Sequence, residues 1–219
     1  MHPPLEAIAA SAPPRLTPAV VARQDDLDAL VRTLSTERVI AVDTESNSFH
    51  VYRERVCLIQ LSTSAGDWVI DPFALDPAPL GPALATVPVL VLHGADYDVR
   101  CLKREYGFSL PNLFDTMAAA RRLGIRELGL SALVHRYFGV RLEKAFQRSD
   151  WGRRPLSADQ VSYAALDTHY LLRLHEVLAE ALVKQGVVEA ARQEFAKISS
   201  VEPRARVFDP HGWRRLKGA

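Results

Sequence analysis

Four acidic side chains and one tyrosine hold most of the chemical information in this sequence. They come from three short segments: Asp43, Glu45, Asp98, Tyr163 and Asp167. Carboxylates about 4 Å apart repel each other by roughly 4 kcal/mol at an effective dielectric constant of 20, which a marginally stable domain cannot hold without cations. Oxygen ligands with no Cys or His among them suit Mg²⁺ or Mn²⁺ rather than zinc. If the four acids converge, the sequence therefore predicts a site for divalent metal ions.

The first two acids, Asp43 and Glu45, follow the apolar run Val39–Val42, which has the composition of a buried strand. Alternate residues of an extended segment point to the same side, so both carboxylates can face one point. Desolvating a carboxylate there is costly unless a cation or hydrogen-bond donors compensate. The common alternative is that both acids simply reach solvent at the end of a strand.

The third acid, Asp98, ends the segment His93–Asp98, between the apolar run 89–92 and a predicted helix over 96–106. Open α/β sheets bind their ligands where strands end and helices begin. On local grounds alone, Asp98 can equally be a first-turn acid that stabilises the helix N-terminus, and Asp96 a helix cap.

The tyrosine and the last acid, Tyr163 and Asp167, lie in a predicted helix that begins at Ser157. Ser157 and Gln160 have the spacing of a capping box. Positions four residues apart share one helix face, so the phenol and the carboxylate point the same way. In isolation, such a pair is more often a surface contact than a site.

The elements that must position these residues alternate between strands and helices. Apolar runs predict four strands: 39–42, 56–62, 68–70 and 89–92. Helical patterns predict helices over 25–34, 96–106, 116–123 and 130–138, and a long helix from 157. The proline-rich residues 72–88 are expected to be a connection. We expect the first three strands to form an antiparallel meander and the fourth, apolar on every residue, to be covered on both faces. The predicted fold class is α/β, with a mixed β-sheet flanked by α-helices.

The bulk composition is that of one globular domain. The chain has 219 residues, 48% of them apolar and 24% charged. Its apolar stretches are far shorter than the roughly 18 residues of a membrane span, and the N-terminus lacks a signal-peptide pattern, so we expect a cytoplasmic protein. Cys57 and Cys101 are expected to be buried, reduced thiols.

The charge is nearly balanced overall, at +1, but it is unevenly distributed. Residues 121–154 contain nine Lys or Arg against three acids. This excess fits either a solvated helix face or a surface that faces phosphate groups, and the pattern alone does not decide between them.

Together, the three segments resemble the motifs of a known family, the ribonuclease D branch of the DnaQ-like (DEDD) 3′→5′ exonucleases, in its tyrosine-containing subclass. The matching segments follow the family's order: Val42–Glu45, His93–Asp98 and Tyr163–Asp167. Shorter signatures agree with the family: Cys57–Leu61, Phe114–Thr116, Lys144, Gln147 and Ser149–Ser157. The sister subclass carries a histidine five positions before the last aspartate, where this chain has Ser162.

The resemblance covers the chain from about residue 20 to 200 and implies a ribonuclease H-like α/β fold. We therefore expect residues 21–200 to form the exonuclease domain and the proline-rich residues 1–20 to be a flexible tail. Residues 201–219 would be a C-terminal tail or linker. Ribonuclease D proteins usually continue into one or two helical nucleic-acid-binding domains, and residues 213–218 resemble the linker that enters them.

The resemblance also implies two divalent metal ions, Mg²⁺ or Mn²⁺. Asp43 would bridge the two ions. Glu45 and Asp167 would complete the shell of the ion that activates water, and Asp98 would support the other ion. Tyr163 would hydrogen-bond the attacking water as an orienting group rather than a general base, because the unperturbed pKa of a phenol is about 10.

Candidate contacts to phosphate, base or the 3′ end come from the same segments and from the basic stretch: Thr44, His93, Tyr97, Lys144, Gln147 and Arg154. His93 would support the site by hydrogen bonding or bind the end of the substrate. For Trp151, core packing is favoured over stacking on a base. Asp115 would either support the site from its strand or cap the following helix.

The expected partner is a nucleic acid with a free 3′ end, and we expect a monomer without membrane attachment. RNA is favoured, as in trimming of tRNA or structured RNA, and DNA repair is the alternative, because no motif here decides recognition of the 2′-hydroxyl. A non-catalytic nucleic-acid-binding module with the same fold is a further alternative.

Overall fold

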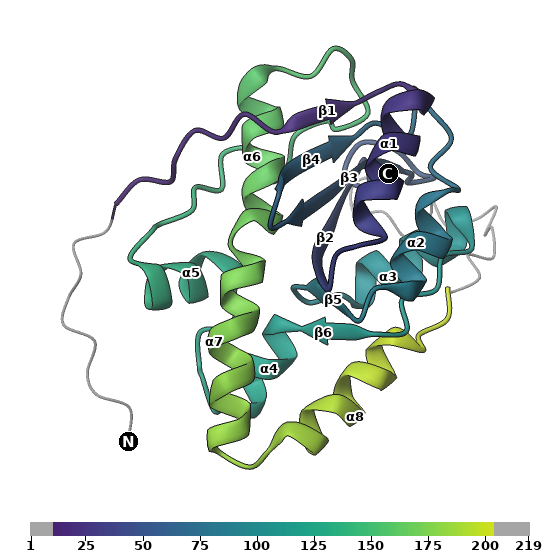
Figure 1. Ribbon diagram of the computed structural model, residues 1–219. Helices are drawn as coiled ribbons and strands as arrows, with labels where there is room; N and C mark the ends of the chain where they lie inside the picture. The colour runs from purple at the N-terminus through teal and green to yellow at the C-terminus, as the bar shows by residue number, and fades with distance from the viewer. Residues whose placement is uncertain (1–10, 204–219) are drawn as a thin grey trace, which may run out of the picture.

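The computed structural model describes residues 11–203, which form a six-stranded β-sheet flanked by helices (Figure 1). The strands are β1 (Ala19–Val21), β2 (Val39–Ser46), β3 (Val56–Thr63), β4 (Gly66–Ile70), β5 (Val89–Leu92) and β6 (Leu113–Asp115), in the order β1-β4-β3-β2-β5-β6. The predicted meander of β2, β3 and β4 is antiparallel. The other pairs are parallel. The prediction of a mixed α/β sheet is therefore confirmed.

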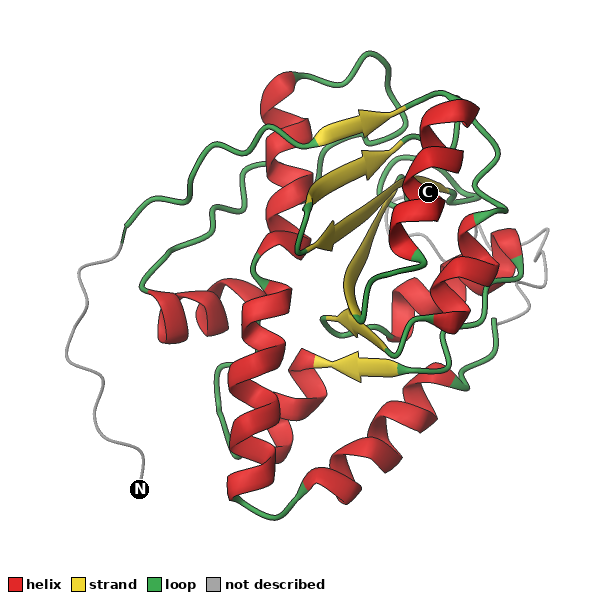
Figure 2. Ribbon diagram, in the orientation of Figure 1, coloured by secondary structure: helices red, strands yellow, loops and turns green. Residues whose placement is uncertain are grey.

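Eight helices are seen in residues 11–203 (Figure 2): α1 (Gln24–Leu34), α2 (Leu80–Thr86), α3 (Asp96–Tyr106), α4 (Thr116–Arg122), α5 (Leu130–Phe138), α6 (Ala158–His169), α7 (Leu171–Lys184) and α8 (Val188–Ser199). The capping box at Ser157 is present. The long helix predicted from Ser157 is two helices, which meet at Tyr170. No helix in the described range is long and apolar enough to cross a membrane.

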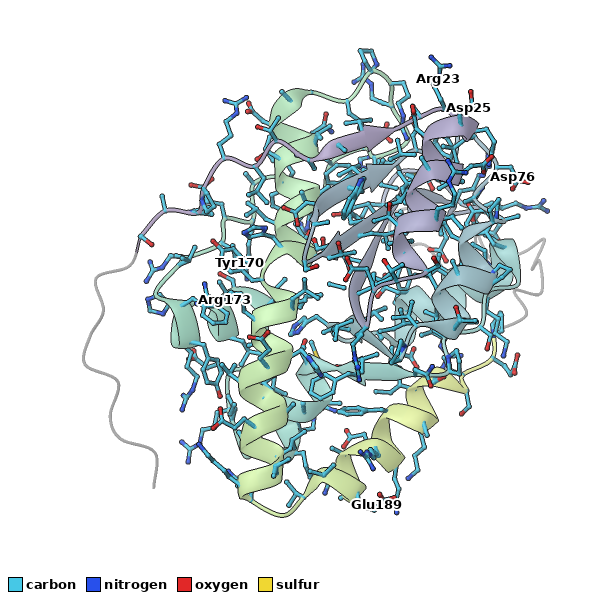
Figure 3. The ribbon with its side chains drawn as sticks, viewed as in Figure 1. Arg23, Asp25, Asp76, Tyr170, Arg173 and Glu189 are labelled. Atoms are coloured by element: carbon cyan, nitrogen blue, oxygen red, sulfur yellow. The ribbon has the colours of Figure 1, made fainter. Side chains whose placement is uncertain are left out.

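The junction of α6 and α7 is held by aromatic packing against α5. Tyr170 and Arg173 lie at this junction, on the side of α5 (Figure 3). The Tyr170 ring stacks on Phe138, with ring centroids 6.0 Å apart, and the Arg173 guanidinium lies 4.6 Å from the same ring. These contacts tie α5 to the helix pair that carries the third sequence motif.

Alternation along the central strands sends apolar side chains to both faces of the sheet. Ile40 and Val42 of β2 pack in one cluster with α1, α2 and α3, whereas Ala41 packs on the opposite face with α4, α7 and α8. Asp43 shares the parity of Ala41, so it points to the face that carries α6 and α7. In β3, Leu58 belongs to the cluster that contains α6 residues.

Residues 11–20 do not behave as the predicted flexible tail. Val20 and its neighbours form β1, which pairs with the edge strand β4. Before β1, the chain crosses α6 (Figure 1), where the Leu16 N–H donates to the Ser162 hydroxyl at 2.9 Å. Ser11 exchanges backbone hydrogen bonds with Gly139 and Arg141. The prolines do not prevent this, because pairing with an open sheet edge supplies partners for the backbone.

Three further elements were not predicted from the sequence. Helix α2 lies within residues 72–88, which were expected to be a connection, and β6 and α8 extend the sheet and its cover. All three are short or lack a strong hydrophobic periodicity, so tertiary packing decides whether they form. The predictions for residues 1–10 and 204–219 lie outside the described residues. Within the predicted C-terminal linker, Glu202 accepts hydrogen bonds from Arg100 and Lys103.

Candidate active site

Strand β2 positions the first two acids. It continues beyond the predicted run to Ser46, because β3 pairs with it along this stretch, with Asp43 opposite Gln60. The other neighbour, β5, pairs only with Val39–Ala41. Asp43 and Glu45 therefore lie where β5 has ended and its chain turns into α3.

The turn from β5 into α3 is supported by Asp115. Gly94 in this turn has a φ of +68°, in the left-handed region that favours glycine. The Asp115 carboxylate accepts the N–H groups of Gly94 at 3.2 Å and Ala95 at 2.8 Å. It also accepts the Ala118 N–H at 2.9 Å and so caps α4. Asp115 thus has both roles that its position in the sequence left open, and it holds the loop that leads to Asp98.

A cavity of about 590 Å³ gathers most of the predicted site residues. Eight of them line it: Asp43, Thr44, Glu45, His93, Lys144, Gln147, Tyr163 and Asp167. The rest of the wall comes from the start of α5, the segment before α6 and one α4 side chain: Gly129, Leu130, Ser131, Ala132, Leu142, Glu143 and Met117. Three predicted residues lie outside this lining: Tyr97, Asp98 and Arg154.

Asp98 lies behind the cavity wall, with only 6% of its surface exposed. The Thr44 hydroxyl donates to Asp98 Oδ1 at 2.5 Å, which joins the first and second motifs across β2 and α3. Thr44 was predicted as a substrate contact. Its side-chain donor is instead used to hold a carboxylate in place.

The four carboxylates share one electrostatic environment. Burial raises the pKa of Asp43 well above its usual value, and the charges of Asp98 and Asp167 raise it further. Burial, followed by Asp167 and Asp98, raises the pKa of Glu45 to about 9. Burial and then Asp98 raise the pKa of Asp167 to about 7, and burial raises that of Asp98 to about 6. Ionised carboxylates are therefore unfavourable here unless a cation compensates them.

The donor set fits a hard divalent cation, although the ligands do not form a closed cage. In the described part of the chain, no group of three or more His, Cys, Asp or Glu side chains is arranged as a formed metal site. Mutual electrostatic repulsion nevertheless requires the carboxylates to be near each other. An open arrangement agrees with this proximity, because like-charged ligands separate when no cation is between them.

Tyr163 stands one helical turn before Asp167 on α6 and lines the same cavity. Its ring stacks on Trp151, with centroids 6.2 Å apart, and meets Phe146 edge-on at 5.7 Å. Burial, followed by the charges of Asp167 and Glu45, raises the pKa of the phenol above its usual value, so it is protonated at neutral pH. Trp151 is only 1% exposed, which confirms the prediction of core packing.

His93 lines the cavity and carries a buried hydrogen-bond acceptor. The Thr116 hydroxyl donates to the Leu92 carbonyl at 3.0 Å, so its oxygen accepts from His93 Nδ1 at 2.9 Å. This fixes the tautomer with the proton on Nδ1 and leaves Nε2 unprotonated. His93 Nε2 is buried without a hydrogen-bond partner among the described residues. Burial lowers the pKa of the ring to about 4, so it is neutral at neutral pH.

Arg154 does not lie where a phosphate contact was predicted. Its guanidinium donates to both Asp71 oxygens, at 2.6 and 2.7 Å, and to the carbonyls of Cys57, Trp151 and Arg153. All five N–H donors of an arginine are thus used. The structure corrects the expectation: Arg154 ties the segment before α6 to β3 and β4 and has no donor left for phosphate.

Tyr97 also lies outside the cavity lining. Its hydroxyl lies 2.7 Å from the Ser46 hydroxyl and donates to Glu54 at 3.2 Å, and the residue is 41% exposed. The predicted contacts Lys144 and Gln147 do reach the cavity.

Gln60 is a site neighbour that the sequence analysis missed. It lies directly opposite Asp43 in the β2–β3 pair, so both side chains point to the same face. It is fully buried, and within the described part of the chain neither polar atom of its amide has a hydrogen-bond partner. Its signal in the sequence was a lone amide inside the otherwise apolar run Cys57–Leu61.

Comparisons with known proteins agree with this site. Residues 18–183 match the family described as 3′–5′ exonuclease. Ribonuclease D of Granulibacter bethesdensis is 34% identical over 206 residues, which are 92% of this chain and 52% of that protein. The exosome complex exonuclease RRP6 of Saccharomyces cerevisiae is 31% identical over 88% of this chain and 28% of its own length.

Solved structures share the fold over nearly the whole chain. The catalytic core of RRP6 from Trypanosoma brucei superposes with a TM-score of 0.84 at 32% identity, covering 94% of this chain and 58% of that one. Escherichia coli RNase D gives a TM-score of 0.79 at 31% identity, covering 91% and 54%.

The chain spans about half or less of the length of the curated relatives it matches. The match nevertheless includes every segment that carries the site, from β2 to α6. Exonucleases of this kind are metal-dependent, which agrees with the clustered carboxylates. The resemblance to ribonuclease D-like enzymes is confirmed, and the chain belongs to the 3′–5′ exonuclease family.

Proposed function

We propose that this protein is a metal-dependent 3′→5′ exonuclease that hydrolyses the terminal phosphodiester bonds of RNA, in the manner of ribonuclease D. The observation that carries the proposal is the group of buried carboxylates from β2, α3 and α6, which raise one another's pKa at and directly behind one cavity. Such an arrangement is unfavourable for the folded protein by itself and becomes favourable once cations occupy it.

Asp43, Glu45, Asp98 and Asp167 would hold two Mg²⁺ or Mn²⁺ ions. When bound, such ions supply charge stabilisation at the phosphate oxygens and lower the pKa of water. The protein's part is to keep the acids together: β2 aims Asp43 and Glu45, the Thr44 hydroxyl fixes Asp98, and α6 presents Asp167.

Tyr163 would orient the attacking water. Because its phenol stays protonated, it acts as a hydrogen-bond donor or acceptor and not as the base that takes the water proton. The packing of its ring against Trp151 and Phe146 limits its movement, which supports a positioning role.

The remaining wall of the cavity would bind the last nucleotide. The Lys144 ammonium suits a phosphate, and the Gln147 amide suits a base or ribose. His93 Nε2 would accept a hydrogen bond from a hydroxyl of the terminal ribose, which agrees with its neutral ring and its lack of a partner within residues 11–203. Arg154 is not part of this proposal.

RNA is favoured over DNA as substrate by the names of the relatives. One is a ribonuclease D, and the Escherichia coli structure is described as an exoribonuclease involved in structured RNA processing. We therefore propose trimming of the 3′ ends of tRNA or other structured RNA. A cytoplasmic location agrees with two free, buried cysteines. We also propose that the protein acts as a monomer.

The test is degradation of an RNA strand labelled at its 5′ end. With Mn²⁺ or Mg²⁺ we expect a ladder of products that shortens from the 3′ end, and no ladder with a chelator. A matched DNA strand measures the preference for ribose, and a strand with a blocked 3′ end tests the direction. An intact strand under all metal conditions would overturn the proposal, and equal or faster hydrolysis of DNA would overturn the choice of RNA.

A further inference from the structure

Two aromatic side chains stand exposed on the loop that follows the strand of Asp43 and Glu45. Phe49 and Tyr52 belong to the β2–β3 loop, and each has 70% of its surface exposed. Arg148 lies next to Phe49, with its guanidinium 6.0 Å from the centre of the ring. We call these three residues, Phe49, Tyr52 and Arg148, the aromatic rim.

The rim joins segments that also build the cavity. The β2–β3 loop begins directly after Ser46, next to Glu45 of the cavity, and Arg148 follows Gln147, which lines the cavity. The Ser46 hydroxyl contacts Tyr97, the neighbour of Asp98. A strand whose last nucleotide occupies the cavity therefore has the rim within reach of the nucleotides that precede it.

The rim is held in place by hydrogen bonds across the two loops. Asn47 Oδ1 accepts the Arg55 N–H at 2.8 Å and closes the base of the β2–β3 loop. His50 Nε2 lies 3.1 Å from the Arg148 carbonyl, which links this loop to the segment that carries Gln147. An exposed surface with such internal support is organised before a ligand arrives, which lowers the entropy cost of binding.

The chemistry of the rim fits one occupant better than others. Flat aromatic faces beside a guanidinium suit unpaired nucleobases and their phosphates, because bases stack on rings and arginine pairs with phosphate. A protein partner would need a larger apolar patch than these three side chains supply. A base-paired duplex hides its base faces and cannot stack on Phe49 and Tyr52.

We propose that the aromatic rim binds unpaired nucleotides that lie further 5′ than the one next to the scissile phosphate, with bases stacked on Phe49 and Tyr52 and a phosphate near Arg148. The proposal rests on the proposed exonuclease function and adds a binding site outside the catalytic cavity. Affinity for the substrate should therefore depend on its length. A dinucleotide contacts the cavity alone, whereas a longer unpaired strand also contacts the rim.

The test compares two substrates, a dinucleotide and an unpaired RNA of about twelve nucleotides, in the full chain with Mn²⁺. Removing one stacking ring lowers affinity by about tenfold. We therefore expect Phe49→Ala and Tyr52→Ala each to lower kcat/KM on the long RNA by about tenfold, with the dinucleotide unchanged. Phe49→Trp keeps a flat ring and should retain the wild-type kcat/KM on the long RNA. Phe49→Leu keeps an apolar side chain but no ring, so its kcat/KM on the long RNA should fall as in Phe49→Ala. Val183→Ala, which alters an exposed apolar side chain on α7, is the matched control.

Binding of the labelled long RNA, measured by fluorescence anisotropy with a chelator, separates the two proposals. Loss of binding in the rim variants supports the rim as a binding site, whether or not the wild type hydrolyses RNA. Absence of hydrolysis by the wild type would contradict only the proposed function. Equal losses on both substrate lengths would overturn the rim as a binding site, because the loop would then act by placing Gln147. Unchanged rates and affinities in variants that unfold at the wild-type temperature would overturn it as well.

Discussion

On the α1, α2 and α3 side of the sheet, apolar side chains form one continuous core, whereas on the α6 and α7 side they form three separate clusters beside buried polar groups. Ile59 and Leu61 of β3 belong to the continuous core. On the other face, Asp43 of β2 lies opposite Gln60, and Gln60 has no hydrogen-bond partner in the described residues. The same two strands therefore supply both environments by alternation.

This difference separates stability from chemistry. Burial of apolar surface stabilises the fold from the first face, while the second face contains carboxylates that raise one another's pKa and so destabilise the metal-free protein. Changes on the first face should act on unfolding and changes on the second on hydrolysis.

The largest expected effect is that of Asp43→Asn. Loss of this carboxylate removes several kcal/mol of charge stabilisation in the transition state, so kcat/KM on the RNA substrate should fall by about 10³-fold or more. The metal-free variant should at the same time unfold at a higher temperature than the wild type, because a buried repulsive charge is gone. Hydrolysis assays and thermal unfolding with a chelator check the two parts. An Asp43→Asn variant that is both active and less stable would contradict the assignment of stability to the apolar face and of hydrolysis to the carboxylate face.

Leu61→Ala tests the other face. Leu61 is fully buried in the continuous core, so its truncation should lower the free energy of unfolding by about 2–5 kcal/mol. Below its unfolding temperature the variant should keep kcat near the wild-type value. Urea unfolding measures the stability, and kcat measured well below the transition serves as the control. A large loss of kcat in folded protein would show that the faces are coupled.

Tyr163→Phe sharpens the assignment within the second face. Removing the hydroxyl keeps the ring packing against Trp151 and removes the proposed hydrogen bond to the attacking water. We expect kcat to fall by about 10- to 100-fold with Mn²⁺ affinity unchanged. Calorimetric titration of Mn²⁺ and single-turnover hydrolysis measure the two quantities. An unchanged rate would remove the phenol from the mechanism.

The smallest expected effect concerns pH. The pKa values of Asp167 and Glu45 in the folded protein, about 7 and about 9, exceed their ordinary values of 3.8 and 4.5. The folded state thus binds more protons than the unfolded state, and stability is lost as pH rises through these pKa values. With a chelator, the unfolding temperature should fall between about pH 6.5 and 9. His93 does not interfere there, because its lowered pKa of about 4 matters only below its ordinary value of 6.5.

Added Mg²⁺ should reverse most of this loss, because a ligand that binds only the folded state stabilises it. The effect of Mg²⁺ should grow with pH, since the ligands must first lose their protons. Asp167→Asn is the matched control, and its metal-free stability should depend less on pH. An unfolding temperature that rises from pH 6.5 to 9 would contradict the electrostatic account of the cavity.

Much of the molecule follows from local sequence. The apolar runs 39–42 and 89–92 predicted buried strands, the Ser157 capping box predicted the start of α6, and the motif order predicted the family. Each of these signals depends on residues within a few positions of each other, where periodicity and hydrogen-bond spacing are set by backbone geometry.

Tertiary structure alone decided the rest, because it depends on partners far apart in the chain. Arg154 carries the charge expected of a phosphate contact, but Asp71, 83 positions away, saturates it. The sequence around residues 11–20 predicts a tail, but the end of this segment forms strand β1 because it pairs with the open edge of β4. The tautomer of His93 depends on the Thr116 hydroxyl, 23 positions away. Sequence thus determined which residue types can do the chemistry, and packing decided which of them have free atoms to do it.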